Sequence, residues 1–174
     1  MTNAIVIAQD LRDCLQTTLG AGLTPIAPQH VMLRAGVEVT PLLGTNDDEC
    51  CRGLGWVRIV RVSGVRQLGD VDNVACFQQE RTLVLELGVA RCAPSAPTAS
   101  VPTEEQWTAA AVQLDDDQGA MEAAICCAFG DLDTYVYAEE VAVGDYEPFG
   151  VDGNCIGGRM QVSVRMTACC PTEG

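Results

Sequence analysis

The sequence contains no lysine, a single histidine and few aromatic residues, which make up 5% of the chain. All 10 basic residues are arginine, and 24 acidic residues outnumber them, so the formal net charge is −14. A protein that grips nucleic acid needs a basic surface to contact phosphates. The charge therefore argues against a nucleic-acid-binding role, although it is compatible with an acidic wall past which DNA slides.

Long apolar runs are missing as well. No stretch is long enough to span a bilayer, and residues 1–20 lack the basic start and uninterrupted apolar run of a secretory signal. The chain has 174 residues, of which 48% are hydrophobic and 20% charged, as is typical of a globular domain. We therefore expect one domain over residues 1–174, folded in a cytoplasm, with no membrane partner.

The common patterns for catalysis and cofactor binding are also missing. The glycines of residues 150–158 form neither GxGxxG nor GxxxxGK, so we do not expect a phosphate site there. His30 lies in a proline-flanked connector, where only a tertiary coincidence would pair it with a thiol. Asp115, Asp116 and Asp117 are consecutive in a predicted helix, so their side chains fan out and should be solvated. We predict no catalytic residue, no cofactor and no enzymatic activity.

Cysteine, in contrast, is abundant. The 10 residues are Cys14, Cys50, Cys51, Cys76, Cys92, Cys126, Cys127, Cys155, Cys169 and Cys170. No CxxC pair occurs, and structural zinc sites usually draw their ligands from such closely spaced pairs, so we predict no metal site. Two interpretations stay open. Most of the thiols are small buried hydrophobic groups, or a few form disulfides once the protein meets an oxidising exterior.

The most strongly patterned stretch is residues 103–129, which we predict to be one long amphipathic helix. Thr103 is suited to be its N-cap, with Gln106 completing a capping box, and Glu104 and Glu105 lie where the helix dipole favours carboxylates. An apolar stripe then recurs at steps of three and four residues, with gaps: Trp107, Ala111, Leu114, Met121, Ile125 and Ala128. A helix with one such stripe needs a flat partner to cover.

The other segments supply that partner. We predict a first helix over residues 5–19 and strands over residues 31–39, 55–62, 81–92, 134–143 and 159–167, with loops at 64–72 and 144–158. The simplest arrangement is an α+β fold, a mixed or antiparallel sheet with two helices packed on one face. The opposite face would carry Arg58, Glu86, Gln161 and Arg165, and should be partly wet or form a polar interface.

Three local patterns resemble a known family. They are residues 51–58 (CRGLGWVR), the run from Trp107 through residues 120–127 (AMEAAICC), and residues 146–158 (YEPFGVDGNCIGG). Together they resemble the tail terminator, a neck protein from the head-to-tail region of long-tailed actinobacteriophages (siphoviruses). The layout is similar to that of the tail terminator of phage lambda, with longer loops at residues 64–72 and 144–158.

The resemblance implies a structural virion protein assembled in the host cytoplasm. Members of the family form a ring, typically of six copies, on the head-proximal end of the tail tube, where they halt tube polymerisation and meet the head connector. The implied partners are further copies of the chain, the tail tube protein and the head-to-tail stopper, and DNA passes through the lumen without specific binding. The acidic charge fits a channel that must not retain DNA.

Other functions compete with this one. The nearest is a head-to-tail stopper or adaptor of the same neck, although stoppers tend to be small β-barrels without a long second helix. A tail tube subunit would carry a long hairpin arm. A cysteine-rich metal-binding regulator is the alternative from a different class.

Our candidate interface residues are Arg58, Arg61, Arg165, Tyr146 and Phe149. The arginines lie on predicted strands and need partners, so we expect each to pair with an acidic residue within the sheet or on a neighbouring subunit. Tyr146 and Phe149 lie in the glycine-rich segment 144–158, which we expect either to contact another neck or tail protein or to form a tight hairpin.

Overall fold

The computed structural model describes residues 4–34, 52–64, 79–95, 101–130, 138–152 and 154–168. Along the chain these form α1 (Ala4–Gly20), a 3-10 turn η1 (Pro28–His30), β1 (Val31–Arg34), β2 (Leu54–Gly64), β3 (Gln79–Cys92), α2 (Glu104–Phe129), β4 (Ala138–Val143), β5 (Glu147–Asp152) and β6 (Cys155–Ala168). Three predicted segments lie partly outside the described residues. They are the loop 64–72 after Gly64, the strand 31–39 after Arg34 and the strand 134–143 before Ala138.

All six strands belong to one mixed sheet with the order β1-β2-β3-β6-β4, and β5 also pairs with β6. The pairing of β1 with β2 is parallel, and the other pairings are antiparallel. β4 and β5 share the same edge of β6: β5 lies beside its first half and β4 beside its second half. The predicted α+β class with a mixed sheet is confirmed.

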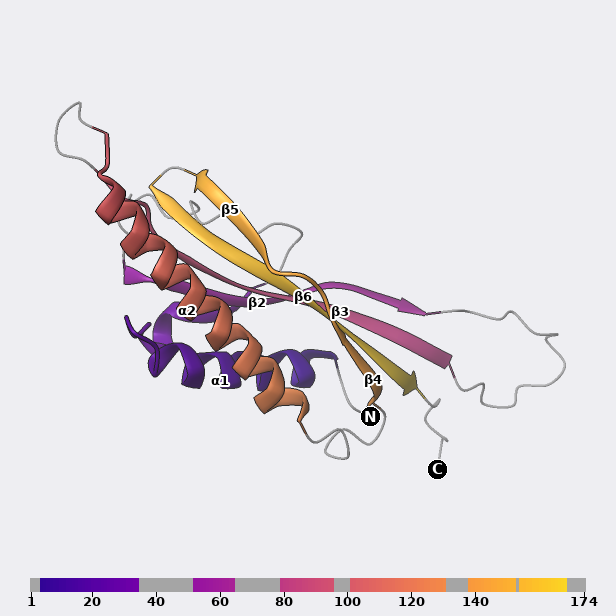
Figure 1. Cartoon of the computed structure of the whole chain (residues 1–174). Coiled ribbons are helices and arrows are strands. Elements are labelled where there is room, and N and C mark those ends of the chain that lie inside the picture. The colour runs from indigo at the N-terminus through magenta and orange to yellow at the C-terminus, as the bar shows by residue number, and fades with distance from the viewer. Residues whose placement is uncertain are drawn as a thin grey trace, which may run out of the picture.

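Both helices lie on the same side of the sheet, and α2 crosses α1 (Figure 1). α1 buries a stripe at every fourth residue, formed by Ile7, Leu11, Leu15 and Leu19. The sheet meets it with alternating apolar residues, which on β3 are Leu83, Leu85, Leu87 and Val89 and on β6 are Met160, Val162, Val164 and Met166. The core therefore lies between one face of the sheet and the helix layer, as predicted.

α2 begins with the predicted capping box. The Thr103 hydroxyl accepts a hydrogen bond from the Gln106 amide at 3.3 Å, and the Gln106 side chain accepts one from the Thr103 amide at 2.8 Å. The predicted apolar stripe is correct only in the second half of the helix, where Met121, Ile125 and Ala128 are buried. In the first half it is wrong, because α2 starts away from α1 and the side chain of Trp107 is 42% exposed (Figure 1).

Segment 144–158 is not the loop that its glycines predicted, and the alternative prediction of a tight hairpin is confirmed. Most of the segment forms β5 and the start of β6, which pair antiparallel with Asp152 opposite Cys155, Phe149 opposite Gly157 and Pro148 opposite Gly158. A Cβ atom on Gly157 would collide with the Phe149 ring, and one on Gly158 would collide with the Tyr146 ring. These glycines serve close ring packing in a sheet, a use of glycine that a sequence pattern does not distinguish from a turn.

Candidate functional site

Arg58, the first candidate interface residue, is buried inside its own chain. Its side chain is paired with Glu86, the residue opposite it on β3, through Nε to Oε1 at 2.7 Å and Nη2 to Oε2 at 2.8 Å. Trp56 Nε1 donates a third hydrogen bond to Glu86 at 3.1 Å. The prediction of an acidic partner is confirmed in its within-sheet form. Since Arg58 is only 6% exposed, it stabilises the sheet and offers little surface to a neighbour.

The Glu86 carboxylate stays charged in this environment. Burial by itself raises its pKa, but the hydrogen bonds from Arg58 and Trp56 and the positive charges of Arg58 and Arg159 outweigh burial, and the pKa lies below the ordinary value of 4.5. A lowered pKa means that the pair stabilises the fold at neutral pH, and that this contribution is lost as the pH falls through the folded-state pKa.

Arg61 and Arg165 are nearer the surface. Arg165, on β6, forms an ion pair with Glu140 on β4 at 3.3 Å, with both side chains about half exposed or more, so its within-sheet partner is confirmed too. Arg61 is exposed on β2 and has no ion-pair partner among the described residues. A β-bulge between Ile59 and Arg61 breaks the alternation of β2 and places Arg61 opposite Val84.

Tyr146 and Phe149 lie on opposite faces of the sheet. Phe149 packs against Trp56, with ring centroids 6.3 Å apart, and Trp56 in turn lies over Gly88, where a Cβ atom would collide with its indole. Tyr146 packs against the main core on the helix side. Its buried hydroxyl makes no hydrogen bond within the described part of the chain, and burial together with the charge of Asp117 raises its pKa above 10.0. Both rings therefore pack against residues of their own subunit, which leaves less of each ring for contact with another protein.

A second buried ion pair joins the helix layer to the sheet, and sequence reasoning missed it. Arg91 at the end of β3 donates two hydrogen bonds to Asp117 on α2, from Nε at 2.9 Å and from Nη2 at 2.5 Å. The two residues are 7% and 1% exposed. The predicted solvation of Asp117 is thus wrong, and the prediction is correct only for exposed Asp115. Asp116 is half-buried and accepts a hydrogen bond from the Leu23 amide at 2.8 Å.

The helical period contained the signal for Asp117. Continued in steps of three or four, the stripe through Leu114 and Met121 has to pass through residue 117 or 118. The prediction of a solvated Asp117 gave more weight to the polarity of its side chain than to its position on the apolar stripe of the helix. A carboxylate on the buried stripe of a helix predicts a buried cation opposite it, and Arg91 is that cation.

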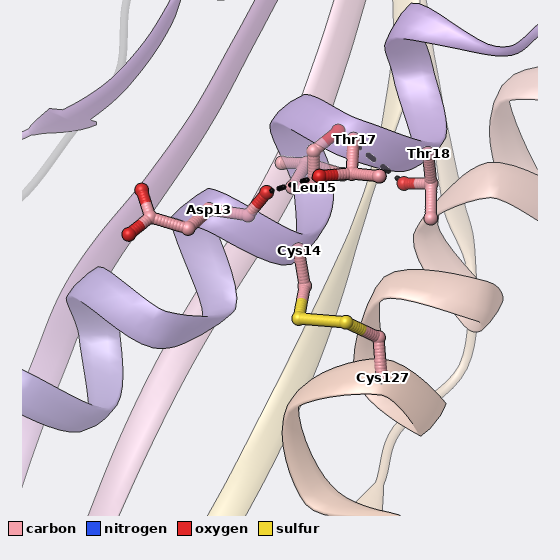
Figure 2. Close-up of a disulfide and its surroundings, with 6 residues drawn as sticks. All are labelled: Asp13, Cys14, Leu15, Thr17, Thr18 and Cys127. Atoms are coloured by element: carbon pink, nitrogen blue, oxygen red, sulfur yellow. Dashed lines mark hydrogen bonds between the residues drawn. A yellow bond between two sulfur atoms is a disulfide. The ribbon is translucent and has the colours of Figure 1, made fainter.

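A disulfide connects the two helices. Cys14 on α1 and Cys127 on α2 are bonded, with their Cα atoms 5.9 Å apart, where the two helices pass each other (Figure 2). Cys92 and Cys155 each take part in a disulfide as well, and Cys126 is a free, exposed thiol. For the described cysteines the disulfide interpretation therefore holds over the buried-thiol one, and Cys50, Cys51, Cys76, Cys169 and Cys170 lie outside the described residues.

Replacing both Cys14 and Cys127 with serine should lower the free energy of unfolding by about 2 to 4 kcal/mol, because the bond closes a long loop and so restricts the unfolded chain. The sequence separation of the two cysteines is 113 residues. Urea unfolding without reductant measures the effect, and Cys126→Ser, which removes the neighbouring exposed thiol, is the matched control. A double variant as stable as the control would show that the bond contributes nothing.

The described residues do not converge on a reaction centre. Among them, no group of three or more His, Cys, Asp or Glu side chains is placed to hold a metal ion. The hollow at the start of α2 is shallow and lined by Thr103, Glu104, Glu105, Thr108 and Ala109, so its carboxylates oppose the anion that a helix N-terminus would attract. None of the described helices is both long and apolar enough to cross a membrane.

In the part of the chain that the structure describes, the two helices and the sheet face turned away from them differ in charge. The acidic residues of the helices are Asp10, Asp13, Glu104, Glu105, Asp115, Asp116, Asp117 and Glu122, and their only basic residue is Arg12. On β3, leucines at odd positions face the helices, so Glu86 and Gly88 face away. The strand register places five arginines on that side, Arg34, Arg58, Arg61, Arg159 and Arg165, which we call the arginine face.

The arginine face carries an excess of positive charge, whereas the helix layer is strongly acidic. Three carboxylates accompany the five arginines: Glu86 pairs with Arg58, Glu147 with Arg159 at 3.0 Å, and Glu140 with Arg165. One subunit therefore presents two unlike surfaces, one on each side of the sheet.

Exposed apolar side chains gather at the beginning of α2. From Glu104 to Val112 every side chain is exposed except half-buried Ala110, and we call this stretch the exposed half of α2. Trp107 is 42% and Val112 54% exposed, and Val101 just before the helix is 83% exposed. At the end of β2, Val60 is 36% and Val62 49% exposed, on either side of Arg61.

No known protein-family model matches this chain, and no curated protein sequence is significantly similar to it.

Proposed function

We propose that this chain is a structural virion protein, a tail terminator that forms a ring at the head-proximal end of a long-tailed phage's tail tube. In that position the ring stops tube polymerisation and joins the tail to the head connector, and DNA passes through its lumen. Its partners are further copies of itself, six in the ring, the tail tube protein and the head-to-tail stopper. It performs no catalysis.

The observation that carries this proposal is the pair of unlike surfaces on one subunit. A strongly acidic helix layer and an arginine face with excess positive charge favour contacts between different surfaces of neighbouring copies over contacts between like surfaces. Contacts of that kind are heterologous, and they produce a closed ring whenever the rotation between copies closes. The formal net charge of −14 also suits a lumen through which DNA moves without being held.

The residues behind the family resemblance support a shared fold. Trp56 from the first pattern packs against Phe149 from the third, and Gly157 makes room for the Phe149 ring. Met121 and Ile125 from the second pattern lie in the main core. These positions carry packing, which is what a family of structural proteins would keep in common.

The sheet architecture favours the terminator over the stopper. The strand order runs from β1 to β4 without returning to β1, so the described sheet is open and does not form a barrel. The long helix α2 also has no counterpart in a small β-barrel with a plugging loop. The stopper or adaptor of the same neck remains the alternative that the experiment below must separate.

Electron microscopy of the purified chain, combined with an assay of tail tube polymerisation, tests the proposal. We expect rings with a lumen wide enough for duplex DNA, and tubes that stop growing when the rings are added. Rings that bind the head connector but leave tube growth unchanged would favour the stopper. A monomer that carries stoichiometric zinc on its thiols would instead support the metal-binding regulator.

A further inference from the structure

The exposed half of α2 has a sequence that favours helix locally, although few of its side chains pack against the core. The capping box at Thr103, the carboxylates of Glu104 and Glu105 in the first turn and the alanines from Ala109 to Ala111 all favour helix locally. A short helix stabilised only by such terms is marginal in water, and here the buried second half of α2 holds the first half in register. The protein therefore presents Trp107 and Val112 on a rigid, solvent-exposed rod.

This rod combines apolar and acidic groups. Trp107, Val112 and the preceding Val101 provide exposed apolar area, and Glu104 and Glu105 provide negative charge. Neither glutamate has an ion-pair partner among the described residues. Tryptophan contributes more binding energy than most residues when it is buried at an interface, so Trp107 would contribute strongly to a contact that covers it.

The end of β2 carries the complementary set. Val60, Arg61, Val62 and Ser63 are all exposed, and we call them the β2 tip. The tip adjoins exposed Arg81, which is paired in register with Gly64. Arg61, opposite Val84, lies on the arginine face, whereas Val62, opposite Leu83, lies on the helix side of the sheet. The tip therefore offers the exposed positive charge of Arg61 next to Val60, where the exposed half of α2 offers apolar side chains beside negative charge.

The two surfaces lie at opposite ends of the same molecule. In Figure 1 the start of α2 lies at one end of the sheet and the tip of β2 at the other. The surfaces cannot meet within one chain, but they can meet between copies. Because each copy has one of each, the contact repeats from subunit to subunit, which is the condition for a ring.

We propose that the exposed half of α2 docks on the β2 tip of a second copy of this chain, with Trp107 against Val60, and with Glu104, which lies three residues before Trp107 and on the same side of the helix, facing Arg61. The contact deepens the proposed function, on which it rests, by naming the two surfaces that join ring neighbours. It is head-to-tail, so one defective surface on a subunit leaves the other able to bind.

The first test is assembly of single-surface variants, measured by light scattering and native mass spectrometry. Trp107→Ala should weaken the subunit contact at least about thirtyfold, as expected for a central tryptophan at an interface. Arg61→Glu and Glu104→Arg should each weaken it by at least about tenfold through like-charge repulsion, and the double charge swap should recover assembly. Glu122→Arg, a charge reversal at an exposed position of the buried half of α2, is the matched control and should assemble normally.

The decisive test mixes two defective variants. Trp107→Ala subunits keep an intact β2 tip, and Arg61→Glu subunits keep an intact α2 surface. A mixture of the two should form heterodimers and no rings, because only one productive contact can form. Circular dichroism checks that each variant is folded, and since every changed side chain is exposed, we expect unchanged spectra.

The outcomes separate this inference from the proposed function. If wild-type rings form and the single-surface variants assemble as well as wild type, the docking surfaces are wrong while the ring stands. If the Glu122→Arg control fails to assemble, or the mixture of defective variants closes into rings, the specific head-to-tail contact is overturned. If the wild-type chain stays monomeric at high concentration and in the presence of tail tube protein, the proposed function itself fails.

Discussion

Arg58→Ala should lower the free energy of unfolding by about 3 to 5 kcal/mol, the typical effect of removing one partner of a buried ion pair. The substitution removes both hydrogen bonds that Arg58 donates to the Glu86 carboxylate, which is 2% exposed, and leaves it the hydrogen bond from Trp56 Nε1. An unpaired buried charge is far less favourable than a charge in water, so the folded state loses most of what the pair contributes. Urea unfolding at neutral pH measures the change.

Two controls give this result its meaning. Arg165→Ala removes an arginine from the same face of the sheet, but its ion pair with Glu140 is exposed, so we expect a change of about 1 kcal/mol or less. Replacing Arg58 with Met together with Glu86 with Leu removes both charges and keeps the volume, and should be much less destabilising than Arg58→Ala. If Arg58→Ala is as mild as Arg165→Ala, the pair does not stabilise the sheet as its burial indicates.

The low pKa of Glu86 provides an independent check. Because the folded-state pKa lies below the ordinary value, the pair's contribution is present above the unfolded-state pKa and disappears as the pH falls through the folded-state pKa. As the pH falls through the folded-state pKa of Glu86, the free energy of unfolding of wild type should therefore fall relative to that of the Met/Leu double variant. A difference that does not depend on pH would mean that Glu86 is not a charged partner of Arg58.

Asp117→Ala should be similarly severe, with a loss of about 3 to 5 kcal/mol, because it leaves the Arg91 guanidinium buried without its carboxylate. The pair holds α2 to the end of β3, so the loss falls on the contact between helix layer and sheet. Asp115→Ala, two positions earlier and exposed, is the matched control and should change stability by no more than about 0.5 kcal/mol.

A titration distinguishes the charge of Asp117 from its packing. Burial is the larger cause of the raised pKa of Tyr146, and the charge of Asp117 is the second. Asp117→Asn keeps the size of the side chain and removes the charge, so the Tyr146 pKa should fall part of the way towards 10.0 without reaching it. An unchanged Tyr146 titration in a folded Asp117→Asn protein would show that the two groups are not coupled.

These two buried pairs also bear on assembly. Glu86, the partner of Arg58, accepts a hydrogen bond from Trp56, whose ring packs against Phe149, and Arg91 binds Asp117 on the helix that carries Trp107. Both pairs therefore help to hold candidate surfaces in position without forming a contact between subunits. Loss of assembly in Arg58→Ala would therefore be a consequence of lost folding, whereas loss in Trp107→Ala would occur in a folded subunit. Measuring unfolding and assembly on the same variants separates the two effects.

Local chemistry in the sequence determined where most of the helices and strands form. The capping residues Thr103 and Gln106 set the start of α2, and the alternation of Leu83, Leu85 and Leu87 set β3 and its buried face, because these signals act between residues close in the chain. The pairing of Arg58 with an acidic residue also followed from the sequence, since a charge on a packed strand needs a partner.

Tertiary contacts alone decided which residues of each sequence pattern are buried and what they pack against. Trp107 lies on the same stripe as Met121 yet stays exposed, because α1 and the sheet reach only the second half of α2. Asp117 is buried because Arg91, distant in the sequence, lies across from it. Gly157 and Gly158 support ring packing in a strand because β5 folds back along β6. In each case the deciding neighbour is far away in the chain, where composition and periodicity carry no information about distance.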